Sequence, residues 1–147
     1  MLKQFLMIAA LSLIILFACS ETKTVTLEFR IAEDESAPGL TEMVFRPTGE
    51  IFYLHNEVFV NESHVDSAFV VMQSGHPAVE LLLTAEGTSK FEELTTNNVG
   101  KKCGMVLNEE LVSAPIIKAP IKVGRAIIAG NFTEAEAQHL ARVLSQQ

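Results

Sequence analysis

The sequence has no tryptophan, a single tyrosine and only two cysteines among its 147 residues. The shortage of aromatic side chains argues against a surface that stacks nucleic-acid bases, and the net charge of −7 argues more strongly against phosphate binding. Two cysteines allow at most one disulfide, which excludes a disulfide-stapled scaffold. What is present, 48% hydrophobic residues in one domain's length of chain, is enough for a single buried core.

The N-terminus has the pattern of a targeting segment. Lys3 precedes an apolar stretch from Phe5 to Phe17, which is shorter than the about 20 residues that span a bilayer as a helix. The stretch ends in Leu16-Phe17-Ala18-Cys19, which resembles the lipobox of bacterial lipoproteins. That resemblance implies cleavage before Cys19 and attachment of acyl chains to it. The alternative is an uncleaved single-pass helix with an incidental cysteine.

The chain therefore divides into a lipoprotein signal peptide at 1–18, a lipidated tether at 19–24 and one domain at 25–147. Strands are predicted where apolar and polar residues alternate or short apolar runs lie between turn residues. Their expected positions are 25–31, 51–54, 57–60, 68–72, 79–83 and 125–129, with a hairpin formed by 103–107 and 111–115. Residues 32–49 contain two prolines, two glycines and an acidic run, which predicts an irregular segment. Pro115 and Pro120 predict an edge or connector at 116–121.

Two helices are marked by their first residues. Thr84 precedes a helix predicted at about 85–97, and Asn61 is expected to cap a short helical turn. Thr133 and Glu136 form a capping box that begins a helix at about 134–145. Asn98-Val99-Gly100 has the pattern of a helix C-terminus. The order of these elements predicts an α+β fold with a mainly antiparallel sheet and two main helices.

Short stretches along the domain also carry a family resemblance. They are Leu27-Glu28-Phe29-Arg30, Pro77-Ala78-Val79, Phe91-Glu92-Glu93-Leu94-Thr95, Asn98-Val99-Gly100-Lys101-Lys102, Ser113-Ala114-Pro115-Ile116-Ile117, Gly130-Asn131-Phe132-Thr133 and Leu140-Ala141-Arg142-Val143-Leu144. In this order they resemble the head subdomain of the first periplasmic region of SecD, a subunit of the SecDF protein-export complex. The resemblance covers about residues 25–147 and implies a SecD-head-like fold.

The resemblance also implies a head that contacts extended polypeptide outside the membrane. SecD continues into a base subdomain and membrane helices that carry its ion-coupling residues. This sequence has no counterpart of them, so the proton-driven motor is not expected here. A lipid on Cys19 is expected to replace the membrane helices as the anchor.

Catalytic and metal-binding patterns are not evident. Cys103 has no base in its local pattern and is expected to be a buried apolar residue. The four histidines are too widely spaced for a metal pair. The acidic cluster at 33–35 lacks the ligand spacing and glycine of a calcium loop. We therefore expect no catalytic residue, no metal and no cofactor.

Basic residues gather in the second half of the chain, whereas the first half is strongly acidic. The candidates for partner binding are Lys101, Lys102, Lys118, Lys122 and Arg125. If they share a face, that face would meet anionic lipid or an acidic partner. The alternative is that the two halves of the chain neutralise each other across the fold.

Taken together, the sequence predicts a lipid-anchored, non-enzymatic protein of the bacterial cell envelope. It is expected to bind polypeptide or an envelope protein, including Sec-type proteins, in connection with protein export, and not nucleic acid. Ser20 after the lipidated cysteine favours the outer membrane over the inner membrane. The alternative function is a small-ligand or metal-binding accessory module that uses the acidic segment at 32–49.

Overall fold

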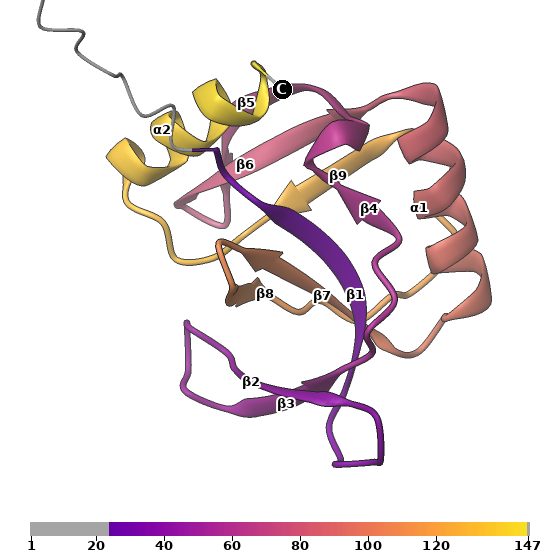
Figure 1. Cartoon of the computed structure of the whole chain (residues 1–147). Helices are drawn as coiled ribbons and strands as arrows, with labels where there is room; N and C mark the ends of the chain where they lie inside the picture. Colours follow the sequence, from indigo (N-terminus) through magenta and orange to yellow (C-terminus); the bar gives the residue numbers. More distant parts are fainter. Residues whose placement is uncertain (1–23, 147) are drawn as a thin grey trace, which may run out of the picture.

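Strand pairing divides the chain into two antiparallel sheets, shown in Figure 1. The computed structural model describes residues 24–146, so Cys19 and the predicted signal peptide lie outside the described residues. The first sheet has the order β2-β3-β1-β7-β8, with β4 paired to β1, and the second has the order β5-β6-β9. The strands are β1 (Leu27–Glu33), β2 (Thr41–Val44), β3 (Ile51–Leu54), β4 (Val60–Asn61), β5 (Val65–Gln73), β6 (His76–Leu83), β7 (Lys102–Leu107), β8 (Glu110–Ser113) and β9 (Arg125–Ile128).

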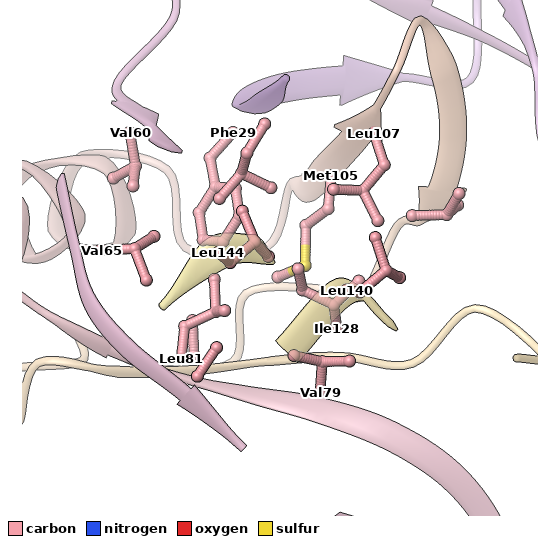
Figure 2. Close-up of a cluster of buried hydrophobic side chains, with 14 of the residues drawn as sticks. Phe29, Val60, Val65, Val79, Leu81, Met105, Leu107, Ile128, Leu140 and Leu144 are labelled. Atoms are coloured by element: carbon pink, nitrogen blue, oxygen red, sulfur yellow. The ribbon is translucent and has the colours of Figure 1, made fainter. Parts of the chain in front are cut away.

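The main core lies between the two sheets. In β1 the alternation of the sequence places Leu27, Phe29 and Ile31 on the buried face. Figure 2 shows Phe29 with Met105 of β7 on one side of this core and Leu81 of β6 on the other. Because burial removes these apolar side chains from water, the hydrophobic effect is the main force that holds the two sheets together.

Two helices complete the core, and both begin where the sequence predicts. Helix α1 (Ala85–Asn97) starts after Thr84, whose hydroxyl accepts a hydrogen bond from the Gly87 N–H. Helix α2 (Glu134–Leu144) starts with the predicted capping box of Thr133 and Glu136. In Figure 1 the two helices lie at opposite ends of the three-stranded sheet. The predicted α+β class with antiparallel pairing is confirmed.

The hairpin turns and the short capped helix also follow the prediction. The turn between β7 and β8 has Asn108 and Glu109 at φ values of 47° and 68°, the left-handed pair of a type I′ turn. Asn61 caps the 3₁₀ helix η1 (Glu62–His64). Gly100 takes a φ of 90° just after α1.

Two predictions in the first half of the domain are wrong. Residues 32–49 are not wholly irregular, because β2 lies within them and pairs with β3 along its whole length. The strand predicted at 57–60 is also wrong in extent; only Val60–Asn61 is a strand, and it pairs with β1. The β2–β3 pair lies at the end of the domain away from α2 and covers a second, smaller core around Leu54 and Leu111.

No helix within residues 24–146 is long and apolar enough to cross a lipid bilayer.

Candidate functional site

An apolar groove of about 440 Å³ lies between β9 and the connector that joins β8 to β9. Its floor is formed by Phe91 and Thr95 of α1 together with Cys103 and Met105 of β7. One wall is the connector segment 115–121, and the other is strand β9 from Arg125 to Ile127. The floor is continuous with the main core, because the Phe91 ring packs edge-on against Phe29 with 5.6 Å between ring centroids.

Backbone hydrogen bonds hold the connector wall to β7 and to the turn between α1 and β7. The Ile117 N–H donates to the Lys101 carbonyl at 2.8 Å, and the Ile117 carbonyl accepts from the Gly100 N–H at 2.8 Å. The Cys103 N–H donates to the Pro115 carbonyl at 2.9 Å. Since Pro115 and Pro120 have no N–H to donate, the segment runs beside the sheet without becoming a strand, as the sequence predicts.

Thr95 fixes the far end of the same wall. Its side chain is almost fully buried, with 1% of its surface exposed. Its Oγ1 accepts a hydrogen bond from the Ile121 N–H at 2.9 Å while its hydroxyl donates to the Phe91 carbonyl of its own helix. One buried hydroxyl therefore fastens the far end of the connector to α1.

The mouth of the groove is apolar and exposed. Ile116 on the connector is 55% exposed and Ile127 on β9 is 38% exposed, although both are large aliphatic side chains. Exposed aliphatic residues scattered singly are common on protein surfaces, whereas these two border one groove. The groove is thus able to take up apolar side chains from outside the molecule.

Three of the predicted basic residues surround this groove. Lys118 and Arg125 line it, and Lys122 lies on the connector between them. Arg125 pairs with Glu80 at 3.4 Å and Lys122 pairs with Glu92 at 3.2 Å, both at the surface. Within the part of the chain that the structure describes, Lys118 has no ion-pair partner. Such exposed pairs are weak and leave the rim available to an acidic ligand.

The other two predicted basic residues lie elsewhere, at the acidic segment. Lys101 Nζ contacts Glu33 Oε1 at 2.9 Å, and Lys102 Nζ contacts Asp34 Oδ2 at 2.6 Å. The hydrogen bond from Lys101, followed by that from His55, holds the pKa of Glu33 below its usual value. These contacts join the acidic half of the chain to the basic half. At Lys101 and Lys102 they agree with the hypothesis that the two halves neutralise each other across the fold.

The same contacts bear on the alternative of a metal-binding module. The carboxylates of Glu33 and Asp34 already accept hydrogen bonds from ammonium groups, which a cation would have to displace. Within residues 24–146, no three His, Cys, Asp or Glu side chains are grouped as a metal would require.

Cys103 is buried as predicted, and it belongs to the floor of the groove. Burial raises the pKa of its thiol to about 12, so the thiol is protonated at neutral pH and is a weak nucleophile. In this setting the side chain contributes apolar surface.

The sequence predicts the basic rim and the connector but not the groove. Its floor and walls come from α1, β7, the connector and β9, which the fold brings together. The one local signal is the apolar connector between Pro115 and Pro120. Because the prolines keep this segment from pairing as a strand, its isoleucine side chains are expected to pack outside the sheet.

Comparison with known proteins gives a consistent result. The sequence model of the SecDF P1 head subdomain matches residues 40–146. The chain is 42% identical over 79 residues to the protein translocase subunit SecDF of Thermus thermophilus, covering 54% of this chain and 11% of that protein. It is 34% identical over 113 residues to SecD of Aquifex aeolicus, covering 76% of this chain and 22% of that protein. The chain thus spans only a small part of the length of these relatives.

Solved structures show the same fold. A structure of SecDF, described as a membrane component that enhances protein export, covers 83% of this chain with a TM-score of 0.66 and 27% identity, over 62% of its own chain. SecDF in its super-membrane-facing form also covers 83% of this chain, with a TM-score of 0.67 and 27% identity, over 19% of its own chain. Over residues 40–146, this chain belongs to the SecDF P1 head subdomain family.

Proposed function

We propose that this domain binds an extended segment of polypeptide in the groove between β9 and the connector, as part of protein export. The observation that carries the proposal is an apolar groove with exposed isoleucines at its mouth and basic residues on its rim. The family membership supports it, because relatives are subunits of a protein translocase. The role proposed for the domain is binding, and its one described thiol, which is buried and protonated, is a weak nucleophile.

An apolar peptide fits the groove better than a charged small molecule does. The floor is built from core residues, and its polar hydroxyl, that of Thr95, is already engaged on both sides. Binding would therefore come from burial of apolar side chains, at roughly 25 cal/mol for each Å² removed from water. The bases at the rim would add orientation and a faster association with an acidic segment.

Fluorescence anisotropy with a labelled seven-residue peptide that alternates valine and glutamate tests this function. Ile116→Glu places a carboxylate at the mouth of the groove and is expected to weaken binding at least about tenfold, which corresponds to about 1.4 kcal/mol. Val44→Glu is the matched control, because Val44 is 59% exposed on β2 and does not line the groove. Equal binding by the two variants, or no binding by the unaltered chain, would contradict the proposal.

We also propose that acyl chains on Cys19 hold the domain, through the tether at 19–24, on the extracytoplasmic side of a bacterial membrane. Several acyl chains on one residue anchor a protein stably, whereas a single chain does so only reversibly. Ser20 after the cysteine favours the outer membrane. Metabolic labelling with a fatty-acid probe is expected to mark the unaltered chain and to leave Cys19→Ser unlabelled. Labelling of both chains, or of neither, would contradict lipid attachment at Cys19 but would leave the proposal of peptide binding in the groove untouched.

A further inference from the structure

Strand β9 has one open edge. It pairs with β6 along Arg125–Ile128, and no other strand within residues 24–146 pairs with it. The Leu83 N–H donates to the Gly124 carbonyl at 2.9 Å, so residues 83 and 124 are a hydrogen-bonded pair of this antiparallel ladder. Hydrogen-bonded pairs alternate along such a ladder. Ala126 and Ile128 therefore bond to β6, whereas Arg125 and Ile127 direct their N–H and C=O groups away from it.

These outward backbone groups have no partner in the part of the chain that the structure describes. The groove lies along the same edge, because it is lined by Ala126, which is buried in the core, and also by Arg125 and Ile127, which face outward. A segment of chain in the groove would therefore lie beside the open backbone of β9 and not across one face of the sheet.

Two other strand edges of the domain are partly covered by the chain itself. At the far edge of the same sheet, the Ala68 N–H donates to Ser145 Oγ at 2.8 Å, and the Ser145 hydroxyl returns to the Ala68 carbonyl at 3.2 Å. At the edge of β8, the Arg46 N–H donates to the Leu111 carbonyl at 2.9 Å. An open edge invites pairing with another chain. Pairing is not blocked at β9, and the groove along this edge offers a place for the side chains of an added strand.

We propose that the bound polypeptide adds to β9 as a fourth strand of the β5-β6-β9 sheet. This inference rests on the proposed function and specifies how the peptide is held. Alternate side chains of the added strand enter the apolar groove, and its backbone bonds to the free groups of Arg125 and Ile127. Acidic side chains of the peptide face Lys118, which no described carboxylate neutralises, and Lys122, whose surface pair with Glu92 is weak. The recognised chemistry is an extended segment that alternates apolar and acidic residues.

Two N-methylated forms of the valine–glutamate peptide separate this mode from binding by side chains alone. One form carries methyl groups on the valine nitrogens and the other on the glutamate nitrogens. In an added strand only alternate N–H groups face β9, so one form is expected to lose at least about tenfold in affinity for the full chain while the other is retained. Equal loss, or equal retention, by the two forms overturns strand addition. Equal retention leaves the proposed function intact, whereas absence of binding by the unmethylated peptide removes both.

A change in the protein gives an independent result. Ile127→Pro removes the outward N–H at an edge position, where proline is tolerated, and Ile127→Val keeps that N–H. Strand addition is supported if Ile127→Pro binds the peptide more weakly than Ile127→Val and has an unchanged thermal unfolding curve. Equal binding by the two variants overturns it. If Ile127→Pro does not fold, the methylated peptides decide. Sedimentation velocity of the unaltered chain without peptide is expected to give a monomer; a dimer that Ile127→Pro dissociates would assign the edge to a second copy and overturn the proposal.

Discussion

The contact between Thr95 and the connector allows a test of how the groove is built. Thr95→Val keeps the size and the β-branched shape of the side chain but removes the oxygen that accepts the Ile121 N–H. The hydrogen bond that the hydroxyl donates to the Phe91 carbonyl is also lost, but this carbonyl lies inside α1 and still accepts the backbone hydrogen bond of the helix. The substitution therefore acts mainly by leaving one backbone donor of the connector without a partner.

The expected cost follows from the burial of the two groups. An unsatisfied buried donor costs about 1–3 kcal/mol. Thr95 is fully buried, whereas Ile121 is only half-buried, so water reaches its N–H in part. We expect Thr95→Val to lower the free energy of unfolding by about 1–2 kcal/mol, in the lower part of that range. We also expect weaker peptide binding, because the connector wall is then free to move.

Urea unfolding and amide hydrogen exchange measure both parts of this prediction. Thr96→Val is the matched control: it makes the same chemical change one residue along α1, on an exposed side chain, and should alter stability by less than about 0.5 kcal/mol. Exchange at the Ile121 amide should become faster in Thr95→Val and stay unchanged in Thr96→Val. Unchanged stability together with a still-protected Ile121 amide would refute the role given to this contact.

Three further predictions follow from single residues. Gly124→Ala should lower the thermal midpoint, because a φ of 63° costs an L-residue about 1–2 kcal/mol and the new methyl would clash with Thr88 Oγ1. A hydrogen bond from the Thr133 N–H lowers the pKa of Glu136, so its stabilisation exists above the ordinary value of 4.5 and disappears as the pH falls through the folded pKa. Urea unfolding should show Glu136→Gln less stable by under about 1 kcal/mol at pH 7, and this difference should shrink as the pH falls below 4.5. Iodoacetamide at pH 8, followed by mass spectrometry, should label Cys103 only in denaturant, since its pKa is about 12; rapid labelling of the folded chain would contradict its burial.

The sequence predicted best those features that depend on neighbouring residues. Both long helices begin where a threonine side chain caps the first turn, and such caps need only three or four consecutive residues. The β7–β8 hairpin was predicted for the same reason, because two apolar runs lie around a short polar turn. These signals are local, and the structure contains each of them.

Features that depend on distant residues were predicted less well. Strand β2 is mostly exposed and is stabilised by pairing with β3, so its sequence has no buried face to reveal it. Residues 57–60 contain a short apolar run, as many strands do, but only the end of this run pairs, and its partner is the distant strand β1. The groove escaped prediction because its floor and walls are spread over more than 30 residues of sequence, from Phe91 to Ile127.

The central claim is that exported polypeptide is bound at the groove, and site-specific photocrosslinking in cells tests it most directly. A photoreactive residue at position 116 lies at the groove mouth, whereas one at position 44 is equally exposed on β2 away from it. With a defined, pulse-labelled exported protein, we predict crosslinks from position 116 that appear during export and are much weaker from position 44. Equal crosslinking from both positions, or none from position 116, would contradict the account.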